Sequence, residues 1–243
     1  MSKKVINQNG NYVTELLNSM RSNFIFDENP INRLKNNTTE LKKNNSEVKV
    51  DKVKELINLK ELINSIEDCD LKDNSKKIVL GDGNINSSVM LIGEAPGIEE
   101  DKAGITFIGG AGDLLKKMLI AINIKKENIY STYAINFRPP EDRKPTSSEI
   151  KRYSKFLQKH ISIIKPKIII LMGSTAMESL TGLNNKISLE RGKWKEIIVK
   201  NTNYHVIITF NPSYLLRTPE NKKYSWEDLK RIKQKIAELN LKI

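Results

Sequence analysis

The sequence predicts an α/β protein with three layers, in which helices cover both faces of a central, mostly parallel, four-stranded sheet. Two observations predict this fold class. Short apolar runs, each bounded by turn residues, alternate along the chain with longer amphipathic segments. The apolar runs are continuous, which is typical of parallel strands that are buried on both faces. We expect this domain at residues 67–243, and a helical, partly disordered extension at residues 1–66.

Within the extension, the apolar residues from Tyr12 to Phe24 recur every four positions, which predicts a helix at residues 11–26. Residues 27–50 are rich in asparagine and lysine and contain few apolar residues, so this stretch is expected to be a solvated linker. A second helical stripe runs from Val53 to Ile66.

The alternating elements follow in order. Apolar or β-branched runs predict strands at residues 89–93, 128–136, 167–173 and 204–210. Apolar residues at helical spacing predict helices at residues 112–124, 147–165, 174–182 and 225–239. Ser147 or Ser148 is a suitable N-cap for the second of these helices, and Gly182 ends the third.

The chain is strongly basic. It has 243 residues, with 41 lysines and arginines against 29 acidic residues, and its net charge of +12 favours nucleic acid or an anionic membrane surface as a partner. A generally lysine-rich composition is the alternative source of this charge. No apolar stretch reaches the roughly 20 residues that span a bilayer. The N-terminus lacks the apolar core of a signal peptide, so we expect a cytoplasmic protein. Of the two kinds of partner, we expect DNA and no membrane.

Three loops of unusual composition follow the predicted strands, and functional groups of such sheets gather at the carboxyl ends of strands. The first loop places Glu94 at the tip of strand 89–93. A carboxylate there suits the cleavage of an N-glycosidic bond, because it can stabilise a sugar that becomes cationic or hold the attacking water. The alternative is that Glu94 caps the next helix, whose first turn carries further acids.

The other loops carry aromatic, basic and apolar residues. Phe107 lies on a glycine-rich stretch, where its ring can stack on a flat base or pack over a helix start. Leu215 and Leu216 lie beside Arg217, as a loop that wedges into a duplex requires. The alternative is that these leucines anchor their loop to the core.

Six motifs, in order and spacing, resemble the family 4 uracil-DNA glycosylases from about Cys69 to the C-terminus. They are GEAPGIEED, TFIGGAGDLLKKML, RPPEDRKPTSSEI, ILMGSTAMESLTG, RGKW, and TFNPSYLLR followed by WEDL. The resemblance implies a DNA repair enzyme that flips uracil out of single- or double-stranded DNA and hydrolyses its glycosidic bond, leaving an abasic site. We expect a monomer.

The resemblance also implies roles for single residues. Glu94 matches the acid that holds the water or the uracil, and Glu100 and Asp101 match an acidic pair linked to activity. Phe107 matches the aromatic residue that stacks on the flipped base, and Leu215 matches the intercalating leucine. The expected DNA contacts are Arg138, Arg143, Ser213, Leu215 and Arg217.

Two pocket residues depart from the family pattern. Asn211 replaces the motif histidine, which donates a hydrogen bond to the uracil, although an asparagine still donates a neutral one. Tyr133 replaces an asparagine that reads the uracil edge, and a tyrosine cannot present the paired donor and acceptor of an amide. Asn136 is the possible substitute, although its spacing from Tyr133 puts it on the opposite face of an ideal strand.

The family usually holds a 4Fe-4S cluster with four cysteines. Cys69, the single cysteine, fits the first position, whereas Lys72, Phe137 and Tyr153 stand at the other three. One thiolate cannot hold this cluster, so we expect no cofactor and no metal, as in the cluster-lacking, alphaproteobacterial-type members of the family.

Two other functions remain open. A degenerate member of the family would bind uracil or abasic DNA without chemistry, but would not need the acidic set of Glu94, Glu100 and Asp101. An α/β enzyme that acts on a small nucleoside is the other possibility, and the basic loops argue against it.

Overall fold

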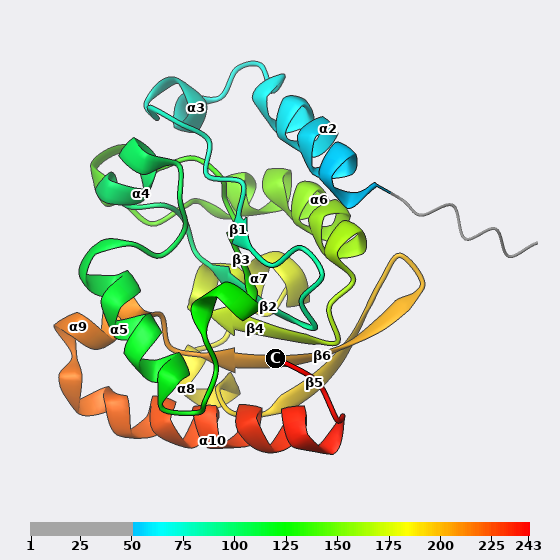
Figure 1. The fold of residues 1–243 in the computed structure, drawn as a ribbon. Helices are drawn as coiled ribbons and strands as arrows, with labels where there is room; N and C mark the ends of the chain where they lie inside the picture. The colour runs from blue at the N-terminus through cyan, green and yellow to red at the C-terminus, as the bar shows by residue number, and fades with distance from the viewer. Residues whose placement is uncertain (1–50) are drawn as a thin grey trace, which may run out of the picture. The chain divides into compact units, whose positions relative to one another are not determined.

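The computed structural model describes residues 51–243, which form an α/β fold around a six-stranded, mostly parallel sheet (Figure 1). The helix predicted at residues 11–26 and the linker at residues 27–50 lie outside the described residues. No helix in the part of the chain that the structure describes is long and apolar enough to cross a membrane.

The strands of the sheet are β1 (Asp82–Gly83), β2 (Val89–Gly93), β3 (Tyr130–Tyr133), β4 (Ile168–Met172), β5 (Trp194–Val199) and β6 (Thr202–Thr209). Their order is β1-β3-β2-β4-β6-β5. The four predicted strands are confirmed as its parallel centre, β3-β2-β4-β6. The prediction of a four-stranded sheet is wrong, because β1 and β5 add an antiparallel strand at each edge.

The two edge strands give weak sequence signals for different reasons. β1 has only two residues. β5 is partly exposed and carries charged residues, as edge strands commonly do. It joins β6 through Lys200 and Asn201, both with positive φ, which is the backbone of a tight hairpin turn.

The α-helices are α2 (Lys52–Asn64), α3 (Asp70–Asp73), α4 (Ile98–Ala103), α5 (Gly109–Ile120), α6 (Ser147–Ile164), α7 (Ser174–Thr181), α8 (Ile187–Glu190), α9 (Pro212–Arg217) and α10 (Lys222–Glu238). The described residues also form three 3-10 turns, η1 (Lys126–Asn128), η2 (Pro140–Asp142) and η3 (Pro219–Asn221). The four helices predicted within residues 67–243 are present, as α5, α6, α7 and α10, and the helical stripe predicted from Val53 to Ile66 is α2.

Helices cover both faces of the sheet because successive strand residues point to opposite sides. Met90 and Ile92 of β2 pack in the core that α2, α6 and α7 share. Val89 and Leu91 pack in the core that α5, α9 and α10 share. The figure shows these helix groups on opposite sides of the strands (Figure 1).

Helix α2 belongs to the same compact unit as the sheet. Its buried residues Leu56, Leu59 and Ile63 pack in the core beside α6. Lys52 fixes its start, because its Nζ donates to the carbonyl oxygens of Ile85 and Ile164 at 3.0 and 2.8 Å. The predicted boundary at residue 66 assigned this helix to the extension, whereas its apolar stripe completes the core of the domain.

Candidate active site

A cleft of about 750 Å³ lies at the carboxyl ends of the parallel strands. Its walls come from the segments that follow β2, β3, β4 and β6, and from the start of α5. The three loops singled out in the sequence all contribute to it, so their predicted convergence is confirmed. They meet because β3, β2, β4 and β6 are consecutive in the sheet and all run in the same direction.

Glu94 lies in this cleft at the tip of β2. Its carbonyl oxygen accepts from the N–H of Ile135 at 3.1 Å, which continues the pairing of β2 with β3. Its carboxylate oxygen Oε1 accepts from Thr175 Oγ1 at 2.6 Å. The alternative role of Glu94 as the cap of the next helix is wrong. The N-cap of α4 is Gly97, whose N–H donates to Glu100 Oε2 at 3.1 Å.

Glu100 and Asp101 are both buried and both hold protein groups. Glu100 lines the cleft, and its second oxygen accepts from Tyr133 Oη at 3.2 Å. Asp101 is not among the lining residues. Its Oδ1 accepts from the N–H groups of Lys76 and Lys77 at 2.8 and 3.3 Å. Asp101 therefore anchors the segment before β1, away from the cleft.

Phe107 and Tyr133 form the aromatic wall of the cleft, with ring centroids 4.9 Å apart. Both rings lie against Gly93, where an added Cβ would come within 2.8 Å of each ring. The N–H of Phe107, a residue with φ of +48°, donates to Tyr133 Oη at 3.0 Å. Tyr133 in turn donates to Glu100, and burial, together with the Glu100 carboxylate, raises its pKa well above the usual value. The hydroxyl therefore stays protonated and is fully engaged within the protein.

Asn211 lines the cleft as the N-cap of α9. Its Oδ1 accepts from both the N–H and the Oγ of Ser213, each at 3.0 Å. These two bonds fix the orientation of the side-chain amide. Within residues 51–243, no hydrogen bond occupies its Nδ2, so this N–H₂ group can donate to a ligand.

Asn136 does not line the cleft. It is buried, and its Nδ2 donates to the carbonyl oxygen of Val79 at 3.0 Å. The expectation that Asn136 replaces the asparagine that reads the uracil edge is wrong. Its amide lies outside the cleft and holds the segment before β1.

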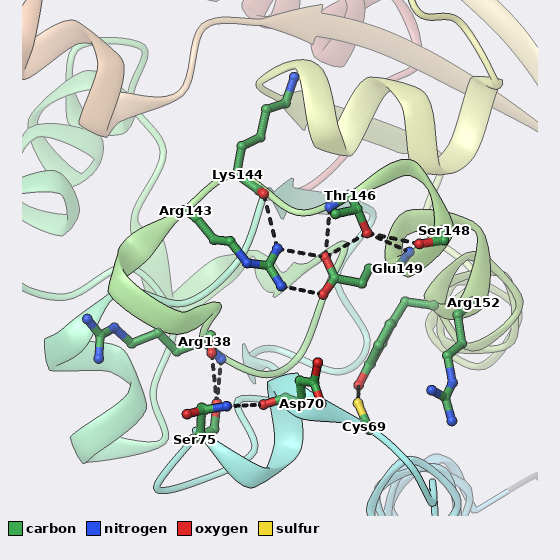
Figure 2. Close-up of polar contacts among 12 residues, drawn as sticks. Cys69, Asp70, Ser75, Arg138, Arg143, Lys144, Thr146, Ser148, Glu149 and Arg152 are labelled. Atoms are coloured by element: carbon green, nitrogen blue, oxygen red, sulfur yellow. Dashed lines mark hydrogen bonds and ion pairs between the residues drawn. The ribbon is translucent and has the colours of Figure 1, made fainter.

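The basic residues differ in their partners, and Figure 2 shows Arg143 paired with Glu149. Arg143 lines the cleft and forms a two-pronged pair with Glu149, at 2.9 and 2.6 Å. This pair, with the Thr146 hydrogen bonds, lowers the pKa of Glu149 to about 2. Arg138 lies outside the cleft lining and pairs with Asp142 at 2.7 Å. Arg217 is exposed at the rim, and no carboxylate of the described chain pairs with it.

Leu215, predicted to intercalate, is completely buried in the core beneath α9. The structure contradicts an intercalating role for it. The next residue, Leu216, is 45% exposed and lies 3.6 Å from the position of a Cβ at Gly110. The reason is that the expected loop is the helix α9, which turns one leucine inward and the next outward. The Asn-Pro pair that starts it is a helix-start signal, with the cap followed by proline at the first position.

The RGKW and WEDL motifs contact each other and the cleft-lining residue Phe210. Asp228 is fully buried and accepts from Arg191 Nε at 3.0 Å and from Thr209 Oγ1 at 2.8 Å. The Arg191 guanidinium also lies over the ring of Phe210, at 5.7 Å from its centroid. Phe210 precedes Asn211, so these contacts help to fix the segment that carries Asn211 into the cleft.

The four positions that correspond to the family's cluster ligands hold Cys69, Lys72, Phe137 and Tyr153. Cys69 Sγ lies 3.3 Å from Tyr153 Oη, and the ring of Phe137 packs edge-on against Tyr153 with centroids 6.4 Å apart. Lys72 donates to the carbonyl oxygen of Ile66 at 3.1 Å. The residues that the structure describes contain no group of three or more His, Cys, Asp and Glu side chains suited to a metal ion. One sulfur among aromatic rings does not fit an iron–sulfur cluster.

Comparisons with known proteins agree with this geometry. Residues 80–231 match the family described as the Uracil DNA glycosylase superfamily. The chain is 36% identical to the type-4 uracil-DNA glycosylase of Thermotoga maritima over 167 residues, which cover 68% of this chain and 86% of the relative. It is 32% identical to the type-4 uracil-DNA glycosylase of Archaeoglobus fulgidus, covering 70% and 87% of the two chains. It is 35% identical to that of Sulfurisphaera tokodaii, covering 72% and 82%.

Proposed function

Because the chain belongs to the type-4 uracil-DNA glycosylases of the Uracil DNA glycosylase superfamily, we propose a role for each part of its cleft. The activity is DNA repair: a uracil flipped out of DNA enters the cleft, and its N-glycosidic bond is hydrolysed to leave an abasic site. One observation carries the assignment of the site. Glu94, Phe107 and Asn211 come from three distant segments and line one cleft.

Glu94 acts on the sugar side of the bond. As the bond breaks, the sugar gains positive charge, and a carboxylate fixed beside it stabilises that charge without having to reorganise. Thr175 occupies Oε1, and no hydrogen bond within residues 51–243 occupies Oε2. Oε2 is therefore the oxygen that holds the attacking water.

Phe107 and Asn211 act on the base. The ring of Phe107 stacks on the flipped uracil, which contributes about 1–3 kcal/mol per stacked base. Asn211 Nδ2 donates to a carbonyl oxygen of the uracil, where negative charge develops as the base departs. Tyr133 and Glu100 have a supporting role, because their hydrogen bonds hold Phe107 rather than the base edge.

The DNA contacts surround the mouth of the cleft. Arg143, Lys144 and Arg217 contact phosphates, and Arg143 shares its charge between a phosphate and Glu149. Leu216, exposed beside Arg217, takes the wedge position that the sequence assigned to Leu215. A single chain supplies all of these groups, so the proposed enzyme works as a monomer on uracil-containing DNA.

We also propose that the protein carries no iron–sulfur cluster and belongs to the cluster-lacking subgroup that it resembles. The support is the donor set, since Cys69 is the single cysteine and Tyr153 contacts its sulfur. Protein produced with ample iron should contain no stoichiometric iron or sulfide. One cluster per chain would contradict this proposal.

The function is tested with oligonucleotides that carry one uracil, as single strands and as duplexes opposite guanine or adenine. Incubation followed by hot alkali should cleave the strand at the uracil, with free uracil released in equal amount. A matched oligonucleotide with thymine is the control and should stay intact. Binding to the uracil strand without alkali-sensitive sites would contradict the proposed activity.

A further inference from the structure

The hydroxyl of Thr175 is the group that holds the Glu94 side chain in place. Thr175 lies in the first turn of α7 and is completely buried. Its Oγ1 donates to Glu94 Oε1 at 2.6 Å, a short distance typical of a hydrogen bond to a charged oxygen. The bond joins residues 81 positions apart in the chain, and connects the tip of β2 with the start of α7.

Gly173 provides the space for this contact. It lies between β4 and α7 with φ of +104°, a conformation that other residues rarely adopt. A Cβ at this position would come within 2.7 Å of Glu94 Oε2 and within 2.9 Å of its Cγ. The glycine therefore lets the Glu94 side chain lie directly against the backbone at the start of the helix.

The contact restricts a side chain that is otherwise free to move. Glu94 is only partly buried at the edge of an open cleft, and a glutamate has several accessible rotamers. The hydrogen bond occupies Oε1, and Gly173 allows close approach of the remainder, so one orientation is selected. That orientation leaves Oε2 available.

We propose that Thr175 is a positioning residue for uracil excision, which acts by holding the Glu94 carboxylate in its working orientation. The inference rests on the proposed function of Glu94. It assigns a role to the GSTAM segment at residues 173–177. Thr175, the threonine of this segment, is buried and acts without touching the substrate.

The test uses Thr175→Val, which keeps the shape of the side chain and removes the hydroxyl. Single-turnover uracil release at saturating protein should slow by roughly tenfold to a hundredfold, because a bond to a charged group is lost. The protein concentration at half-saturation should not change, since Thr175 touches no DNA. Thr175→Ser should restore most of the rate. Ser179→Ala is the matched control, because Ser179 is buried in the same helix but donates to the carbonyl oxygen of Ala176.

A double-mutant cycle shows whether Thr175 acts through Glu94. In a Glu94→Ala background, Thr175→Val should change the rate by less than about twofold. An active wild type with an unaffected Thr175→Val variant would overturn the inference and leave the proposed function intact. Equal slowing in both backgrounds, or slowing with a matching loss of thermal stability and no rescue by serine, would also overturn it. A wild type that releases no uracil would instead refute the proposed function, and the positioning role with it.

Discussion

Leu215 and Leu216 give a sharp prediction, because adjacent and chemically identical residues have opposite environments. Leu215 is completely buried in the core, so Leu215→Ala removes packed atoms and leaves a cavity. Such truncations cost about 2–5 kcal/mol of folding free energy. Leu216 is 45% exposed, and Leu216→Ala should cost less than about 1 kcal/mol.

The effects on activity should be reversed. Flipping a base out of a duplex costs a few kcal/mol, which a wedge offsets, whereas a single strand needs little unstacking. Leu216→Ala should therefore slow excision from duplex DNA about tenfold or more and change excision from single strands little. Leu215→Ala should keep the ratio of the two rates close to that of the wild type.

The assays are urea unfolding for stability and single-turnover uracil release from matched single-stranded and duplex oligonucleotides. The two variants serve as controls for each other. A duplex-selective loss in Leu215→Ala, with none in Leu216→Ala, would refute the reasoning and restore the original assignment from the sequence.

The remaining predictions concern the base site and the core. Asn211→His, which introduces the histidine of the resembling motif, should raise the single-turnover rate, while weakening the α9 cap by about 0.5–2 kcal/mol in urea unfolding. Phe107→Leu keeps an apolar side chain in the wall but removes the ring, so binding to DNA with a flipped uracil should weaken by about 1–3 kcal/mol, with abasic DNA as the control. The last of these predictions concerns His160, which is buried in α6. Burial lowers its pKa from 6.5 to about 3. The unfolded chain therefore binds a proton below about pH 6.5 that the fold does not, and stability should fall by up to about 1.4 kcal/mol per pH unit as the pH drops from 6.5 towards 3. Unfolding of His160→Gln at several pH values should show a shallower fall; an identical slope would contradict this.

The sequence is sufficient for the parallel core and for the place of the cleft. The apolar runs of β2, β4 and the second half of β6 are continuous because both faces of the sheet are buried there. The carboxyl ends of such parallel strands meet wherever the connections are helical. On that basis Glu94 and Asn211, which follow β2 and β6, could be placed at one edge of the sheet. The assignment of Phe107 to the same site depended on the resemblance to the glycosylase family.

The partners of the site residues could not be predicted in the same way. Tyr133 bonds with Phe107 and Glu100, which are 26 and 33 positions away in the chain. Thr175 reaches Glu94 across 81 positions. Such pairs depend on strand register and on where each helix begins, and neither follows from the periodicity of one segment.

Short elements were missed for a related reason. Helix α9 has six residues, too few for a helical period to be visible, and its absence from the prediction reversed the roles of Leu215 and Leu216. The local cap signal of Asn211 and Pro212 was present, but it does not reveal which leucine faces the core.

The most direct test of the central claim is single-turnover uracil release by the wild type and by Glu94→Gln, with binding to an abasic-site duplex measured for both. Glutamine keeps the shape and the hydrogen bond from Thr175 but removes the negative charge that stabilises the cationic sugar. We predict equal affinity for the abasic duplex and a rate about tenfold to a thousandfold lower for Glu94→Gln. Equal rates for the two proteins would contradict the claim that this carboxylate carries the chemistry of the cleft.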